Sequence, residues 1–572
     1  MNFFDPTSAH GQIIIGLVIA VLAGLFNIGN IKRGILNLIQ LIKWRLLKVK
    51  PDKFSIIICS IENDEDTTVL KTVSKLLVSG FSWLEVHGAP NINLNVDEIN
   101  PRDCIEKNHS KARRILREKK ADLLVWGYCT NTHLKIFFEH QGFSTEGKKS
   151  YSLATINEVV LPKEFSNDIG LVILAVAYGH ILNPPHTREF LERKFVIDFY
   201  SIAKKLDVLL QEMPDSLKEF EYFLWDATAS AYYNAYVGSQ SDREPLVQAI
   251  SRQLKVLEIV PKDKPLLIKL CLAANYAAYV SELAKNDKNP QGFIEALNIY
   301  QDVFKEITFS NCPDFATFKF GQANTHLEFS SILPVQEIQV DLLKKSIDCF
   351  EEAIAAVPIN DGLIIAKYKN NLAVAYKRIG QITNSVEYLQ KAVDILQEVT
   401  EIHTIDEVPY TWAITVSNIA SNLGLIGCLS NSRGDLESSI SYYRSALEVQ
   451  NPNIRVDDWF KSVSGCAGSY SNIGGIFKDK KVFEEAIELL NNSRVLIKKK
   501  YFHLYCRLSW QLGEILFRMG SIFSSPDYYN DSILILEELK ETKGIEQVGL
   551  TQAQVEKNIQ QAESRITELV DN

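Results

Sequence analysis

Small and bulky apolar residues repeat in a helical pattern through the second half of the chain, most clearly at 471–493. Two stretches with the apolar spacing of helices flank a lysine-rich turn at 477–481. Small residues stand where two antiparallel helices would touch, and bulky residues fill the gaps. The small residues are Gly474, Ala486 and Ser493, and the bulky ones are Ile473, Phe477 and Leu490. A single helix pair cannot bury its apolar face, so the pattern predicts an array of pairs.

The second-helix part of this pattern recurs along the chain. The recurring small residues are Ala249, Ala296, Ser346, Ser385, Ser439, Ala486 and Ser532. Further packing positions follow each of them four and seven residues later, as Leu389 and Ala392 follow Ser385. The intervals exceed the roughly 34 residues of a common two-helix repeat. We therefore expect long helices or inserted loops, such as one at 430–435.

Residues 372–392 and 473–493 resemble tetratricopeptide repeats, and the pattern is degenerate before Gly321. Residues 370–395 are especially similar to the repeats of kinesin light chains. In those repeats an asparagine precedes the small-residue pair and faces a concave groove. The resemblance implies a right-handed helical solenoid that binds a peptide or protein partner and performs no catalysis.

An amide side chain precedes the small-residue pair in four successive repeats. These amides belong to Asn371, Asn422, Asn472 and Gln511. One amide can donate to a peptide C=O and accept from its N–H, so the column predicts a groove that binds a peptide backbone. Lys367 and Lys377 are near enough to favour acidic ligands. The alternative is that the amides bond between adjacent helices.

The amino-terminal segment 1–31 contains an uncharged apolar run at 11–31. As a helix it would be about 31 Å long, which matches one hydrocarbon core. Lysines and arginines follow the run and do not precede it. This asymmetry predicts a single-pass protein of the cell inner membrane, with the N-terminus outside and the remaining domains in the cytoplasm. A buried core helix is the alternative.

Gly16, Ala20 and Gly24 recur at every fourth position of this run, a spacing that lets membrane helices approach closely. They predict self-association, although membrane helices use small residues widely. Segment 32–53 continues with a basic amphipathic helix at 32–50. Such a helix suits an anionic leaflet. Packing on the following domain would explain it equally.

Residues 54–162 predict a small α/β domain. Five strands are expected, at 54–61, 83–87, 121–128, 133–140 and 151–161, with helices at about 66–77 and 104–119. Ala121, Asp122 and Gly127, with the order of elements, resemble the amino-terminal domain of TolB-type proteins and FlgO-type domains. The resemblance implies a non-catalytic interaction domain.

Composition and motifs give no support for catalysis. The 572 residues carry a net charge of −9, which provides no general attraction for nucleic acid. Nine scattered cysteines form no Cys-x-x-Cys motif, and no phosphate-binding glycine loop or His-x-x-x-His pair occurs. Acidic residues at 62–66 could hold Mg²⁺, but acids also stabilise a helix amino terminus. We expect no catalytic residues, cofactor or metal.

These patterns together predict an α+β chain with a transmembrane helix, a small α/β sheet domain and a large all-α solenoid. Degenerate repeats should cover 163–320, and tetratricopeptide-like repeats with a capping helix at 552–570 should cover 321–572. The predicted function is a membrane-anchored scaffold for a protein or peptide partner. One alternative is a signalling or defence sensor whose membrane helix oligomerises when the repeats bind. Another is an enzyme that uses the acids at 62–66.

Overall fold

The computed structural model describes five strands, several residues between 108 and 121, and most of 199–571. The gaps in that last range are 214–217, 219–220, 240–242, 309–311, 313–314, 358–361, 407–408, 454–455, 542–544 and 546–549. The chain forms two compact units, Met1–Gly321 and Gln322–Asn572. The predicted membrane span, its Gly16/Ala20/Gly24 face and the basic helix at 32–50 lie outside the described residues.

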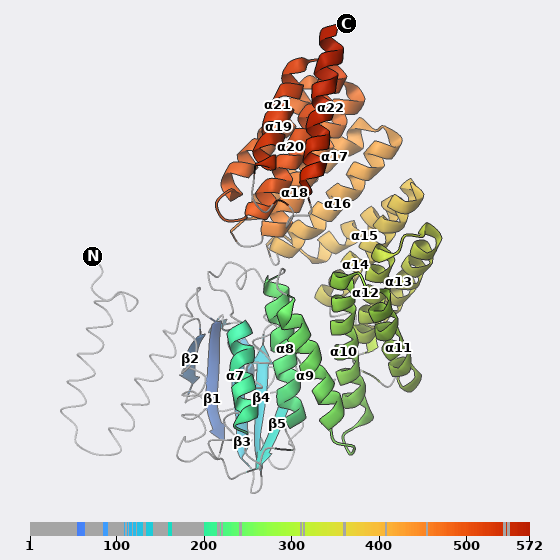
Figure 1. Ribbon diagram of the computed structural model, residues 1–572. Helices are drawn as coiled ribbons and strands as arrows, with labels where there is room; N and C mark the ends of the chain where they lie inside the picture. Colours follow the sequence, from blue (N-terminus) through green and yellow to red (C-terminus); the bar gives the residue numbers. More distant parts are fainter. Residues whose placement is uncertain are drawn as a thin grey trace, which may run out of the picture. The chain divides into compact units, whose positions relative to one another are not determined.

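The first unit contains the predicted sheet, whose strands run in the order β2-β1-β3-β4-β5. β1 pairs in parallel with β2 and β3, whereas β4 and β5 are added antiparallel. The strands are β1 (Phe54–Glu62), β2 (Leu84–Ala89), β3 (Leu123–Cys129), β4 (His133–His140) and β5 (Glu158–Pro162). All five predicted strands are present (Figure 1), and the fifth is shorter than expected among the described residues.

The sheet is held by a dense apolar core. Trp126 of β3 stacks on Phe137 of β4 with ring centroids 4.2 Å apart. Ala112 and Leu116, from the predicted helix at 104–119, are fully buried in the same cluster. The continuous apolar run of β1 reflects this packing, since Ile56, Ile57 and Ile58 are all inaccessible to solvent.

The described residues of the first unit also form helices that pack in pairs. These helices are α7 (Phe199–Gln211), α8 (Glu221–Ser239), α9 (Glu244–Ile259), α10 (Leu266–Asp287) and α11 (Pro290–Glu306). α12 (Phe315–Ile332) begins in this unit and ends in the second. α8 packs on α9, and α10 packs on α11. Regular helix pairing therefore begins well before the repeats that the sequence shows clearly.

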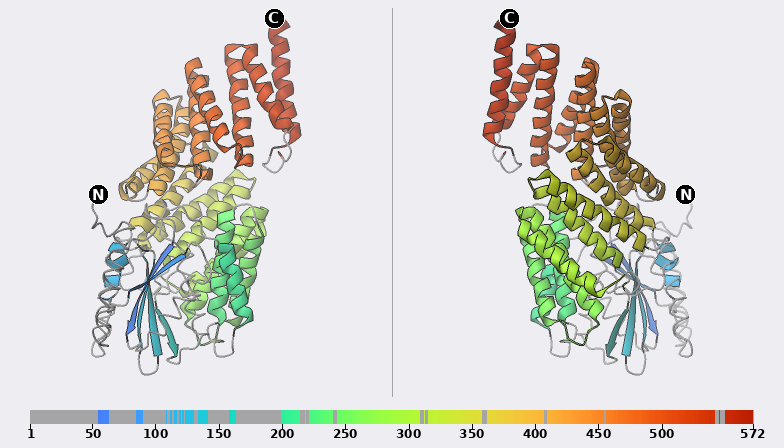
Figure 2. Two further views of the ribbon diagram at one scale, coloured as in Figure 1. Left: turned by 90° about the vertical axis from the view of Figure 1, so that its left-hand side faces the viewer. Right: turned by 90° about the vertical axis from the view of Figure 1, so that its right-hand side faces the viewer.

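The second unit continues with α13 (Gln336–Ala356) and then four regular pairs (Figure 2). We call α14 (Gly362–Thr383), α16 (Pro409–Ser430), α18 (Val456–Phe477) and α20 (Phe502–Phe523) the first helices. The second helices are α15 (Val386–Ile402), α17 (Arg433–Val449), α19 (Lys480–Ile497) and α21 (Pro526–Lys540). α22 (Gln552–Asp571) packs on α21 as the predicted final helix.

Long first helices explain the long repeat interval. Each first helix has 22 residues. This length corresponds to about 33 Å. The loop expected at 430–435 does not exist, because α16 ends at Ser430 and α17 begins at Arg433. The extra residues of the repeat therefore lie in helices.

The same tight turn closes each of the four pairs. A non-glycine residue adopts left-handed backbone geometry there, with φ of 50–53° at Asn384, Asn431, Lys478 and Ser524. The next backbone N–H then donates to the carbonyl of a glycine in the last turn of the first helix, at 2.9–3.2 Å. This geometry satisfies a helix-end carbonyl that would otherwise lack a partner.

Two packing predictions need correction. A Cβ added to Gly474 would collide with the ring of Phe483, so Phe483 fills the gap assigned to Phe477. Phe477 is instead 37% exposed. Ser385 lies at the amino-terminal cap of α15, and the buried small residue of that helix is Ala392. A seven-residue shift along a helix preserves the apolar face, which is why both registers fitted the pattern.

Two described helices, α10 and α16, are long and apolar enough to cross a membrane by length and composition alone. Each also packs against neighbouring helices, as core helices of such an array do: α10 against α9 and α11, and α16 against α15 and α17.

Candidate functional site on the first-helix face

Side-chain hydrogen bonds link successive first helices of the second unit. Asn370 Nδ2 donates to Thr415 Oγ1 at 3.0 Å, and the hydroxyls of Ser417 and Ser462 lie 2.7 Å apart. Gln511 Nε2 donates to the Ser464 carbonyl at 2.8 Å. The bonded residues are 45–47 positions apart, one repeat interval. Serine and asparagine are short, so these bonds require the first helices to lie close together.

Successive second helices are linked by longer side chains. Arg444 of α17 pairs with Glu485 of α19 at 3.3 Å, and Lys498 pairs with Glu538 of α21 at 3.0 Å. Long side chains bridge a wider separation than a pair of serines. The first helices therefore form the inner side of the curved array, and we call their solvent-facing surface the first-helix face.

Three of the four predicted amides form hydrogen bonds from one helix to another, Asn371 to α12 and the other two between first helices. Asn371 Nδ2 donates to Asn324 Oδ1 at 2.9 Å, and Asn472 Oδ1 accepts from Arg518 Nη1 at 3.0 Å. Gln511 donates to α18 as described above. These bonds correspond to the alternative that the sequence left open. Binding of a peptide by the amide column stays a prediction.

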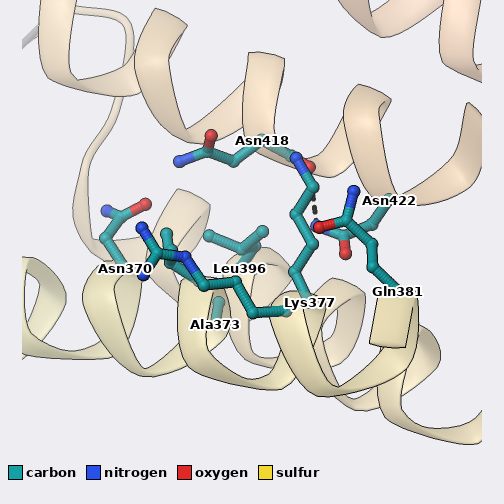
Figure 3. Close-up of a pocket in the computed structure, with 9 residues that line it drawn as sticks. Asn370, Ala373, Lys377, Gln381, Leu396, Asn418 and Asn422 are labelled. Carbon is teal, nitrogen blue, oxygen red and sulfur yellow. Dashed lines mark hydrogen bonds between the residues drawn. The ribbon is translucent and has the colours of Figure 1, made fainter. Parts of the chain in front are cut away.

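The fourth amide, Asn422, lines a pocket of about 280 Å³ between α14 and α16 (Figure 3). Asn422 Nδ2 donates to the Asn418 carbonyl at 2.8 Å, but its buried Oδ1 accepts no hydrogen bond. The residue is only 1% exposed. A buried amide oxygen without a donor costs free energy unless a ligand or water supplies one. The other lining residues are Asn370, Ala373, Val374, Lys377, Arg378, Gln381, Leu396 and Asn418.

Lys377 extends from α14 across this pocket toward α16 (Figure 3), where its Nζ donates to Ser421 Oγ at 2.6 Å. In the part of the chain that the structure describes, no carboxylate pairs with it. Burial, with a smaller contribution from Arg378, lowers the pKa of Lys377 to about 8. Arg378 differs, because it pairs with Glu328 at 3.6 Å. Lys367, the other predicted lysine, is exposed on α14 outside the pocket lining.

Sequence reasoning missed Asn370, Asn418 and Gln381 as lining residues. Asn418 and Asn422 are one helical turn apart, and that spacing was the available signal. This spacing did not show that α14 would lie against α16 and complete the pocket.

Small residues stand at helical spacing along α18. Ser464 and Ser471 lie on the side that contacts α20, through Gln511 and Arg518 respectively. Gly468 lies between them at helical spacing, and a Cβ added there would meet no atom within 4 Å. The face therefore has room at Gly468 for an approaching chain.

The described residues hold no group of three His, Cys, Asp or Glu side chains placed to bind a metal ion. Burial raises the pKa of the Cys466 thiol to about 12, so this cysteine is not activated as a nucleophile.

Residues 365–403, which fall on α14 and α15, match the family model of the tetratricopeptide repeat. The array is of tetratricopeptide type. A search of curated proteins finds no match.

Several solved structures are similar to this chain, all at low identity and low TM-score. A Rap protein complexed with competence and sporulation factor is 12% identical, with 64% of this chain and 99% of that chain covered and a TM-score of 0.26. Yeast Tom70 is 11% identical, with coverages of 69% and 96% and a TM-score of 0.19. A circular tandem repeat protein is 11% identical, with coverages of 65% and 90% and a TM-score of 0.25. Likenesses this distant transfer no functional detail.

Proposed function

We propose that the protein is a non-catalytic scaffold that binds a protein or peptide partner on the first-helix face. The tetratricopeptide-type array supports this function, because arrays of this kind present an extended inner surface. The observation that carries the proposal is the pocket between α14 and α16. Lys377 there has no carboxylate partner among the described residues, and Asn422 Oδ1 has no donor.

The pocket matches the chemistry of a polypeptide with an acidic group. The Lys377 ammonium has further N–H donors for a carboxylate, and the lining amides of Gln381 and Asn418 can each donate to and accept from a peptide backbone. A polypeptide partner with an acidic side chain would supply groups for both kinds of contact. We therefore assign binding of the acidic group to Lys377 alone and not to Lys367 and Lys377 together.

The scaffold is proposed to act at a membrane, on the evidence of the uncharged run at 11–31 and the basic residues after it. The N-terminus would lie outside and the repeats in the cytoplasm. Self-association through Gly16, Ala20 and Gly24 would make the protein a sensor, in which partner binding changes the oligomeric state. The sensor reading is the second candidate.

Two glycines allow a test that leaves the fold intact. Gly468 on α18 and Gly434 on α17 are helical positions where an added Cβ meets no atom within 4 Å. Leucine at Gly468, inside α18, should improve helix propensity by about 0.8 kcal/mol, and at Gly434, in the first turn of α17, by less. Only Gly468→Leu places bulk on the first-helix face. Affinity capture of the full chain from detergent-solubilised membranes, followed by mass spectrometry, should recover a partner that Gly468→Leu loses by about tenfold or more.

Gly434→Leu is the matched control and should retain the partner. Lys377→Met tests the pocket separately, because it removes the cation and keeps most of the side-chain volume. Undiminished capture by both Gly468→Leu and Lys377→Met would refute binding on this face. Recovery of the chain alone, as a homo-oligomer, would favour the sensor.

A further inference from the structure

The outer surface of α19 changes character in its last turn. Its exposed residues up to Asn492 are charged or polar: Lys480, Lys481, Glu484, Glu488, Asn491 and Asn492. Val495 and Leu496 follow, and they are 78% and 69% exposed. Phe502, which begins α20, is 43% exposed. Large apolar side chains gathered on an otherwise polar surface mark an interaction site.

Three consecutive lysines, Lys498, Lys499 and Lys500, form the turn that directly follows α19. Lys498 pairs with Glu538, which also accepts from Arg494 at 3.1 Å. Lys499 and Lys500 are exposed, and neither pairs with a carboxylate among the residues that the structure describes. We call Val495, Leu496, Lys499, Lys500 and Phe502 the α19–α20 tip.

The tip combines two properties that anionic lipid surfaces recognise. Apolar side chains can enter the boundary between headgroups and acyl chains, while lysines reach the phosphates from their flexible stems. Each lysine near an anionic surface adds electrostatic attraction. A purely apolar protein partner would leave the two lysine charges unmatched, so the charge pattern favours lipid.

We propose that the α19–α20 tip docks on anionic lipid headgroups, which gives the array a second contact with the membrane. The inference rests on the membrane anchoring proposed above. Three apolar side chains and two lysines bind lipid weakly by themselves. A chain already held at the bilayer experiences a high effective concentration of lipid, so a weak contact becomes populated.

The test compares the full chain in nanodiscs of neutral phosphatidylcholine with nanodiscs that also contain anionic phosphatidylglycerol. Lysine acetylation is followed residue by residue with mass spectrometry. Lys499 and Lys500 should react about threefold or more slowly in anionic discs. Lys478, exposed in the turn between α18 and α19, is the internal control and should not change.

Two variants separate the tip from general attraction to the disc. Replacing both Val495→Ser and Leu496→Ser should abolish the protection, while Leu534→Ser should not. Leu534, on α21, is a matched control because it is also apolar and is 65% exposed. Equal acetylation in the two kinds of disc, or protection that survives the double replacement, would overturn the proposal.

Failure of anchoring is distinguishable from failure of docking. A chain that does not incorporate into discs lacks the proposed span. Flotation of that chain with vesicles of the same two compositions, in a lipid excess large enough to populate a weak contact, then tests the tip directly. Binding to anionic vesicles alone, lost in the double variant, would support docking, and equal recovery with both compositions would overturn it.

Discussion

Neighbouring repeats are held together differently on the two sides of the array. First helices share hydrogen bonds, some between short neutral side chains, as between Ser417 and Ser462, and some from a long cation, as from Arg518 to Asn472. Second helices are linked by ion pairs between long side chains, as between Arg444 and Glu485. A neutral hydrogen bond contributes about 1 kcal/mol, and an exposed ion pair contributes between about 0 and 1 kcal/mol. The inner side therefore sets the spacing of the repeats, and the outer side tolerates variation.

The largest expected effect comes from the contact between the two helices of one pair. Gly474→Leu would force its side chain into Phe483, and we expect it to destabilise the array by about 3 kcal/mol or more. A Cβ added to Gly468 on the same helix meets no atom within 4 Å, so Gly468→Leu should be neutral or stabilising. Urea unfolding of both variants measures the difference. Equal urea midpoints for the two variants would show that Gly474 does not pack against Phe483.

In the first unit, a buried carboxylate takes part in the hydrogen bonds between neighbouring helices. Asn275 Nδ2 of α10 donates to Asp226 Oδ1 of α8 at 3.5 Å. Burial raises the pKa of Asp226 from 3.8 to about 6, although hydrogen bonds from Gln253 and Asn275 oppose the shift. The folded state thus binds this proton more tightly than the unfolded state. The contribution of Asp226 to the free energy of unfolding should therefore fall by about 3 kcal/mol as pH rises from about 4 to about 6.

Asp226→Asn removes this titration. Unfolding free energies measured between pH 4 and pH 7 should fall less steeply in the variant than in the wild type. Parallel profiles would mean that Asp226 has an ordinary pKa.

The smallest effects test the two kinds of link directly. Ser417→Ala should cost about 1 kcal/mol at any ionic strength, because the bond is neutral and half-buried. Arg444→Gln should cost less than about 1 kcal/mol, and the loss should vanish in 1 M salt. Thermal unfolding at two salt concentrations compares them. A stability cost of Ser417→Ala that changes with salt, or a cost of Arg444→Gln that does not, would contradict the assignment of a neutral bond to the first and an ion pair to the second.

Local patterns predicted the helices better than their register. The five strands and the pair at 471–493 follow from apolar periodicity, because each reflects contacts within a few residues of sequence. Ser385 was assigned the place of Ala392, since a shift of two helical turns leaves the apolar face unchanged.

The links across repeats were beyond the sequence. Arg518 reaches Asn472 over 46 positions, and only the packing of whole helices brings them together. The same holds for the pocket, whose residues come from three helices.

The repeated turn has a consequence for engineering. Lys288, Asn384, Asn431, Lys478 and Ser524 all carry left-handed backbone geometry without being glycine. Such a residue costs roughly 1 kcal/mol relative to glycine. Because each turn closes its own helix pair, glycine substitutions at separate turns should act independently. Glycine could therefore be introduced at one turn after another to raise thermal stability step by step. The surfaces of the helices would stay unchanged.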